Sequence, residues 1–178
     1  MGGKKETVVF ISMGKLNIVV LLATIGMLFG VLVLHLLLFG GGAITFTFSG
    51  LLLFLAGMII MVVIHEAIHL IGFRYIGDVP RKELAWGVNW KMGVAYAHAK
   101  KPITVAQMKK VLMLPFVPTG LLPLILGVSM NFLPISMLGV ILTVGCFGDV
   151  ALYRKVMKFP DEALVLDHPT KPQFTVYE

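Results

Sequence analysis

The sequence has few charged residues and only one cysteine. Charged side chains make up 13% of the 178 residues, hydrophobic ones make up 58%, and the mean hydropathy is +0.94. A soluble domain does not need this much apolar surface to build its core, so the composition predicts an integral membrane protein. Because Cys146 has no second cysteine to pair with, an intramolecular disulfide is excluded.

The sequence also lacks the amphipathic basic face that a nucleic-acid-binding protein needs. Its net charge of +6 comes from Lys and Arg residues in short segments between apolar runs. We therefore expect the lipid bilayer, and no nucleic acid, as a partner. No A-x-A-like cleavage site follows the first apolar run, which predicts a retained span and not a signal peptide.

Four apolar stretches are long enough to cross a bilayer, whose core requires about 20 residues per helix. They cover residues 16–39, 50–73, 111–132 and 134–153. The predicted fold is an all-α membrane protein with four transmembrane helices and a β-hairpin-containing loop between helices 2 and 3. Glycines at 40–42 separate the first two spans, and residues 131–134 predict a tight turn between the last two.

The distribution of positive charge predicts the topology. Lys and Arg residues precede the first span, occur throughout the loop at 75–110 and follow the fourth span, whereas the other two loops have none. By the positive-inside rule, both termini and the long loop face the cytoplasm. The predicted organisation is a cytoplasmic N-terminus at 1–15, a four-span membrane domain at 16–155 and a cytoplasmic tail at 156–178.

Only two of the nine acids lie inside the predicted spans, Glu66 and Asp149. Charged groups at membrane depth are costly and usually functional. Glu66 belongs to an H-E-x-x-H motif, whose spacing puts His65 and His69 one turn apart on one helix face. Both can then bind one tetrahedral zinc ion while Glu66 acts as a catalytic base. A chance pentapeptide with two buried histidines is the alternative, and it would leave an unpaired carboxylate in lipid.

A catalytic zinc ion usually has three protein ligands, so the motif predicts a third. Asp149 lies five residues before Arg154, which is about 7 Å along a helix, and the motif lies about 10 Å before Arg74. The two elements are therefore expected at similar depth, with Asp149 as the third ligand. Alternatively, Asp149 is a helix-end carboxylate that pairs with Arg154 or Lys155.

The loop at 75–110 contributes further candidates. His98 could fold back towards the motif, as a reserve ligand or as a donor to the transition state. Asn89 and Tyr96 are candidate substrate-binding residues.

Three further polar positions have other expected roles. His35, near the opposite end of the first span, is expected to be interfacial or hydrogen-bonded, and Cys146 is more often a small buried hydrophobe than a ligand. Asp167 and His168 lie in the polar tail and are expected to take no part in the site.

The H-E-x-x-H span, followed two spans later by an aspartate, resembles the core of site-2-type intramembrane metalloproteases. The chain resembles more closely the small bacterial zincin peptidase family, in which a Gly-Asp pair, here Gly148 and Asp149, follows in the last span. The resemblance covers about residues 50–155. Site-2 proteases have Asn-Pro-Asp-Gly or Leu-Asp-Gly where this chain has Phe-Gly-Asp-Val. The resemblance implies a zinc-dependent peptidase of membrane-spanning or membrane-adjacent polypeptides, in a prokaryotic inner or plasma membrane.

Residues 84–98 alternate with a period of two. Large residues occupy the even positions and mainly small or polar ones the odd positions. A hairpin with an odd loop, at residues 89–91, keeps this parity and predicts one large apolar face and one nearly bare face. We expect one edge of the hairpin to receive an extended substrate strand, or the hairpin merely to cap the helices.

Thr104 and Gln107 have the capping-box form and predict a helix that runs into the third span. Pro115, Pro118 and Pro123 then interrupt this helix, either as simple kinks or beside a substrate groove or water path.

Two glycines of the first span, Gly26 and Gly30, have G-x-x-x-G spacing. This spacing is typical of a dimer face or of packing within one chain, so a homodimer is one alternative.

These expectations together predict a zinc metalloprotease of the H-E-x-x-H type, an intramembrane or membrane-proximal endopeptidase. Glu66 would take a proton from water and pass it to the leaving amine. The alternative is a membrane protein that binds metal or substrate without hydrolysis. A transporter would need further ligands across the bilayer, where only His35 is available, and a ligand-only site would not need Glu66. Five histidines are too few for a di-iron oxidase or desaturase.

Overall fold

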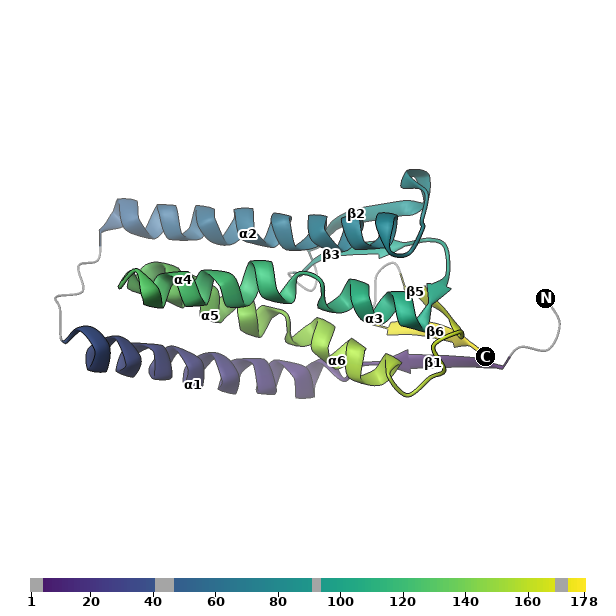
Figure 1. Ribbon diagram of the computed structural model, residues 1–178, viewed down its shortest axis with the longest axis horizontal. Coiled ribbons are helices and arrows are strands. Elements are labelled where there is room, and N and C mark those ends of the chain that lie inside the picture. Colours follow the sequence, from purple (N-terminus) through teal and green to yellow (C-terminus); the bar gives the residue numbers. More distant parts are fainter. Residues whose placement is uncertain (1–4, 41–46, 91–93, 169–172) are drawn as a thin grey trace. The chain divides into compact units, whose positions relative to one another are not determined.

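The computed structural model describes residues 5–40, 47–90, 94–168 and 173–178. Four helical segments are long and apolar enough to cross a membrane (Figure 1): Met13–Phe39, Phe48–Tyr75, Val105–Ser129 and Leu133–Val156. The four predicted stretches are therefore helical and have the length and composition of membrane spans, although the third helical segment begins earlier, at Val105. The chain divides into two compact units, of residues 1–13, 65–115 and 148–178 and of residues 14–64 and 116–147.

The second unit is helical. It contains α1 (Met13–Phe39), the first part of α2 (Phe48–Tyr75), the π-helix η2 (Phe116–Leu121), α4 (Leu122–Ser129) and α5 (Leu133–Gly145). Helices α4 and α5 pack closely because glycines line their contact: a Cβ on Gly127 would collide with the backbone of Ser136, and one on Gly139 with that of Leu124. The predicted turn between these helices is present, with Asn131 at a positive φ of 51°.

The buried His35 is hydrogen-bonded inside this unit, as one of the two expectations for it stated. Its Nδ1 lies 3.3 Å from Asn131 Oδ1 and its Nε2 lies 2.9 Å from Ser136 Oγ. Gly26 and Gly30 are exposed, and a Cβ on either would meet no described atom within 4 Å. Packing within the chain therefore does not explain their spacing, and the homodimer stays a prediction.

The first unit contains two small sheets, so the all-α prediction was incomplete. One sheet has the antiparallel order β1-β6-β5-β4, from β1 (Glu6–Phe10), β6 (Gln173–Tyr177), β5 (Leu164–Asp167) and β4 (Ile103–Thr104). The predicted polar tail thus forms strands that pair with the N-terminal segment. This pairing joins opposite ends of the chain, which a local pattern cannot predict.

The sheet encloses the hydrophobic core of the first unit together with α3 (Val105–Met113) and α6 (Phe147–Val156). Its fully buried members include Val105, Val111, Val156, Val165 and Val176. The predicted capping box starts α3: Thr104 Oγ1 accepts a hydrogen bond from Gln107 N–H, and Gln107 Oε1 accepts one from Thr104 N–H.

The prolines of the third span interrupt its helix, as expected. Helix α3 ends at Met113, a π-helical segment follows at Phe116–Leu121, and α4 resumes the α-helix. The fourth span is also divided into two helices, α5 and α6, which are separated at Cys146. The sequence has no proline at this position, so this break was not predicted.

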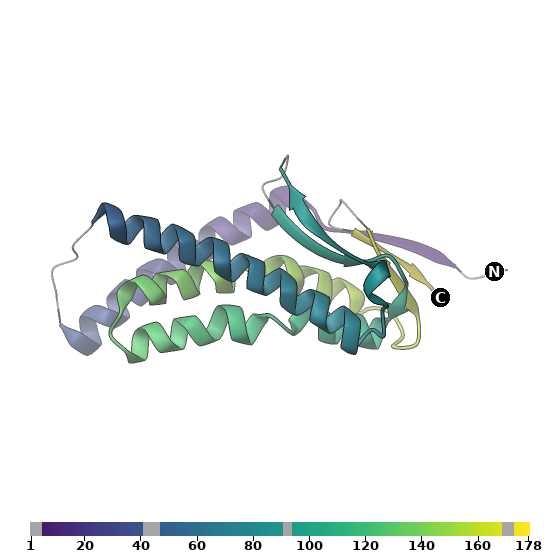
Figure 2. The same ribbon diagram turned by 90° about the horizontal axis from the view of Figure 1, so that it is seen from above.

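The second sheet is the predicted hairpin, formed by β2 (Leu84–Asn89) and β3 (Val94–Ala99), which lie side by side in Figure 2. Four residues, 90–93, separate the two strands, so the predicted odd loop was wrong. The loop at 91–93 lies outside the described residues. Directly opposite residues of an antiparallel pair share a face of the sheet. With an even loop, even-numbered residues of β2 therefore share a face with odd-numbered residues of β3.

Large residues of one strand therefore face small residues of the other. Trp86 lies opposite Ala97, and Tyr96 lies opposite Gly87. The tyrosine ring covers the glycine so closely that a Cβ there would come within 2.8 Å of its hydroxyl oxygen. The prediction of one large face and one bare face was therefore wrong.

Candidate metal centre

The two motif histidines lie on α2, near its C-terminal end. The i, i+4 spacing brings the Nε2 atoms of His65 and His69 to within 3.2 Å of each other, with the rings edge-on. The two Nε2 atoms thus lie on one face of the helix, as the spacing predicted.

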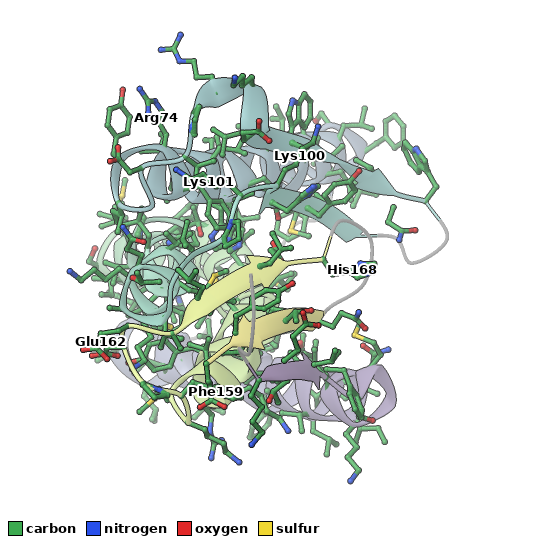
Figure 3. All side chains as sticks on the ribbon, turned by 90° about the vertical axis from the view of Figure 1, so that its right-hand side faces the viewer. Arg74, Lys100, Lys101, Phe159, Glu162 and His168 are labelled. Atoms are coloured by element: carbon green, nitrogen blue, oxygen red, sulfur yellow. The ribbon has the colours of Figure 1, made fainter. Side chains whose placement is uncertain are left out.

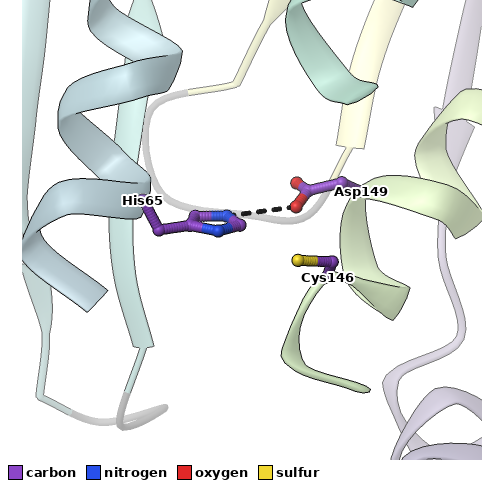
Figure 4. Close-up of side chains that lie close together, drawn as sticks. All are labelled: His65, Cys146 and Asp149. Carbon is purple, nitrogen blue, oxygen red and sulfur yellow. Dashed lines mark ion pairs between the residues drawn. The ribbon is translucent and has the colours of Figure 1, made fainter. Parts of the chain in front are cut away.

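Asp149 meets both histidines from the first turn of α6. Its Oδ2 lies 3.2 Å from Nε2 of His65, and its Oδ1 lies 3.4 Å from Nε2 of His69. Figure 4 shows His65 and Asp149 pointing towards each other from their two helices. A helix N-terminus favours a negative charge, so this place in α6 suits the carboxylate. In the described part of the chain, Asp149 forms ion pairs with these histidines and not with Arg154 or Lys155.

The three residues fit a zinc ion. Zinc bonds of about 2.0–2.1 Å at a tetrahedral angle place neighbouring ligand atoms about 3.3 Å apart. The contacts here are close to this spacing: 3.2 Å between the two Nε2 atoms, 3.2 Å from His65 Nε2 to Asp149 Oδ2 and 3.4 Å from His69 Nε2 to Asp149 Oδ1, so that each histidine faces a different oxygen of the carboxylate. Electron-pair donors this close repel one another unless a cation or a proton lies between them. Two imidazoles and one carboxylate are also an established ligand set of catalytic zinc.

A hydrogen bond orients the His69 ring. Its Nδ1 lies 3.1 Å from the carbonyl oxygen of Val111, which only accepts, so Nδ1 donates and Nε2 of the neutral ring keeps the lone pair. Gly72 lets α3 come this close to α2, because a Cβ at this position would press on both methyl groups of Val111 at 3.3 Å.

Glu66 faces the hairpin. Its carboxylate accepts a hydrogen bond from the backbone N–H of Ala97 on β3, and the charges of His65, His69 and Asp149 all act on it. The catalytic-base candidate therefore lies between the three candidate ligands and a β-strand.

Among the described strands, only β2 pairs with the strand that contacts Glu66, which leaves the other edge of β3 unpaired. Lys100 N–H donates to the Glu83 carbonyl at 2.8 Å, which fixes the alternation of hydrogen bonds along the hairpin. The backbone groups of Ala95, Ala97 and Ala99 consequently point away from β2. We call these outward-pointing groups the β3 edge. Three alanines along it allow another backbone to approach closely.

His98 follows Ala97 and is buried, with 6% of its surface exposed. Its ring stacks on Tyr96, and its Nδ1 has no hydrogen-bond partner among the described residues. Burial lowers the pKa of His98, and the charges of Lys100 and His168 lower this pKa further, so the ring is neutral near pH 7. Its role as reserve ligand or transition-state donor stays a prediction.

Asn89 and Tyr96 share one face of the hairpin, Asn89 at the end of β2 and Tyr96 over Gly87. Their part in substrate binding also stays a prediction. Cys146 is buried in the second unit, where its Sγ lies 3.2 Å from the Leu142 carbonyl oxygen.

Asp167 is a residue that sequence reasoning left out of the site. The pKa of its carboxyl is raised to about 7, mainly because the group is buried. The charges of Asp149 and Glu66 also raise this pKa, whereas the N–H of His168 and the charge of His69 lower it. The tail therefore brings a titratable group within electrostatic reach of the motif. Only the fold of the tail reveals this proximity, because no motif surrounds Asp167.

A helix with H-E-x-x-H and a nearby carboxylate is the constellation of a zincin-type metallopeptidase. The family described as "Putative zincin peptidase" matches residues 58–164, more than half of the chain. The chain therefore belongs to this family, and the matched region includes His65, Glu66, His69 and Asp149. No curated protein and no solved structure matches the chain.

Proposed function

We propose that this protein is a zinc-dependent endopeptidase that hydrolyses peptide bonds of membrane-associated polypeptides, within the bilayer or at its cytoplasmic surface. The observation that carries the proposal is the convergence of His65, His69 and Asp149, whose ligand atoms approach one another to 3.2–3.4 Å, with Glu66 beside them. The family and the four apolar helices support it.

Zinc would be held by His65, His69 and Asp149. When bound, it supplies a Lewis acid that polarises a carbonyl group and acidifies water. The side chains of His65 and Asp149 are 15% and 19% exposed, so water and a substrate carbonyl can reach them.

Glu66 would act as the general base and then as the general acid. Its carboxylate takes a proton from the attacking water, and the protonated carboxyl then gives this proton to the nitrogen of the scissile bond. The bond between carbonyl carbon and nitrogen breaks, and the products are a carboxylate and an amine. The N–H of Ala97 holds the Glu66 carboxylate in place for both transfers.

The substrate would bind as an extended strand along the β3 edge. A helix hides its peptide bonds in internal hydrogen bonds, so a transmembrane substrate must unwind before hydrolysis. Because Ala97 belongs to this edge and donates to Glu66, a strand added here places its backbone next to the base. Positive charge at both termini and in the 75–110 loop supports a cytoplasmic location for this part of the chain.

The test is zinc content and cleavage of a transmembrane model substrate by Glu66→Gln, in lipid nanodiscs. The variant keeps all three ligands, so it should retain one zinc ion per chain and lose a factor of about 10² to 10⁴ in kcat. The exposed acid Glu162 provides the matched control, Glu162→Gln, with wild-type zinc and wild-type kcat. Full cleavage by Glu66→Gln would exclude the proposed base. A wild type that holds zinc but cleaves nothing would favour a binding protein instead.

A further inference from the structure

Strand β5 ends at Asp167. The proposed mechanism of peptide hydrolysis does not use the carboxyl group of this residue. Asp167 lies opposite Phe174 of β6, two residues after Val165. Alternation along a strand puts these three side chains on one face of the sheet. Val165 and Phe174 are buried in the core of the first unit, with 0% and 2% of their surfaces exposed. Asp167 therefore points to the inner side of the sheet.

Among the described residues, the Asp167 carboxyl has no cationic partner. Its Oδ1 accepts a hydrogen bond from the N–H of His168 at 2.9 Å. Within the described ranges of the chain, no Lys or Arg forms an ion pair with it, whereas the exposed Asp161 pairs with Lys109 at 2.6 Å. A carboxylate removed from water is stable when a positive group compensates it. A bound ligand can supply that group.

The same carboxyl is near both the candidate metal centre and the substrate strand. The charges of His69, Asp149 and Glu66 act on Asp167, and such interactions weaken with distance. Part of strand β5 also lies close to β3 without pairing with it. Figure 3 looks onto this end of the unit and labels His168, Lys100 and Lys101.

A second buried polar group belongs to this region. Nδ1 of His98 has no hydrogen-bond partner among the described residues, and the charge of His168, the neighbour of Asp167, acts on this ring. Lys100, whose charge also acts on His98, is exposed to water and so is screened. The surroundings of β3 thus contain a carboxyl group and an uncharged imidazole that an incoming group could contact.

Positively charged side chains are what a substrate would bring to this place. Polypeptides that cross a membrane carry Lys and Arg next to the cytoplasmic ends of their spans. A cationic side chain beside Asp167 would favour the ionised form of this carboxyl group.

We propose that Asp167 is a specificity-determining residue whose carboxylate binds the ammonium or guanidinium group of a Lys or Arg close to the scissile bond. The proposal rests on the proposed peptidase function and names its substrate class: polypeptides with a basic residue beside the end of a transmembrane span. Asp167 lies beyond residue 164, where the family match ends, so the preference belongs to this chain's own tail.

Binding to zinc-loaded Glu66→Gln tests the proposal without requiring cleavage. The probes are transmembrane peptides in which one lysine is moved residue by residue along the juxtamembrane segment. At each position, norleucine is the uncharged control of similar shape. At one position the lysine peptide should bind about tenfold more tightly or better, since a hydrogen bond to a charged group is worth this much.

Second-site variants then assign the preference. Adding Asp167→Asn should bring the lysine-to-norleucine ratio close to one, Asp167→Glu should keep it, and Asp167→Lys should favour a glutamate peptide. Asp161→Asn, which removes an exposed carboxylate of the same segment, should leave the ratio unchanged. Thermal unfolding of each variant identifies any loss of fold.

Two outcomes overturn the proposal: a ratio near one at every position, or a ratio that persists in folded Asp167→Asn and Asp167→Lys. Failure of the peptidase function would look different, because the wild type would then cleave no peptide while the ratio still depended on Asp167.

Discussion

At the scale of single residues, the sequence was most informative where chemistry requires fixed spacing. His65 and His69 lie close together because side chains four residues apart are neighbours on one face of a helix. Asp149 was placed near this pair from its depth alone, and the two imidazoles do contact its carboxylate. Asp167 was not foreseeable, because its proximity depends on the fold of a tail that carries no periodic pattern.

Asp149→Ala should weaken zinc binding. Loss of an outer hydrogen-bond partner typically costs 10–100-fold in metal affinity, so loss of a ligand should cost more than about 100-fold. Competition with a chromophoric chelator measures the change in Kd for zinc. Asp161→Ala, which removes a carboxylate that pairs only with Lys109 in the described structure, is the matched control and should bind zinc as the wild type does. Equal affinity of Asp149→Ala and wild type would move the third ligand elsewhere, with His98 to be tested next.

At the scale of elements, the hairpin shows how far a pattern of alternation can be used. The period of two correctly predicted strands at 84–89 and 94–99, but the faces depend on whether the loop is odd or even. Sequence alternation carries no information on this parity. The capping box of α3 was predictable because Thr104 and Gln107 act on each other locally.

The β3 edge makes a specific prediction about the substrate backbone. In an added strand, every second N–H points towards β3 and the others point away. Methylating one inward N–H removes a hydrogen bond worth about 0.5–1.5 kcal/mol, so kcat/KM should fall about 2- to 10-fold. The neighbouring amides, which point outward, are the internal controls.

Cleavage assays on a peptide series with one N-methyl group at each position measure this pattern. Losses should recur with a period of two around the scissile bond. A uniform effect, or one that follows every third or fourth residue, would contradict binding along the β3 edge and indicate a helical substrate.

At the scale of the whole chain, composition and run length predicted the spans, because the bilayer demands some 20 apolar residues per crossing. The four-stranded sheet was missed for a physical reason. Its outer strand β1 has only five residues and ends three residues before α1 begins, and this segment was predicted to be a cytoplasmic N-terminus without secondary structure. Its partner β6 comes from the other end of the chain, and such pairing is decided by tertiary contacts.

A single zinc ion held by two imidazoles and one carboxylate is tested most directly by X-ray absorption at the zinc edge of the purified wild-type protein. One zinc ion per chain is expected, with nitrogen and oxygen neighbours at about 2.0–2.1 Å and the scattering pattern of two imidazole rings. Absence of zinc, or a sulfur neighbour at about 2.3 Å, would contradict this ligand set. A sulfur neighbour could come only from Cys146 or a methionine.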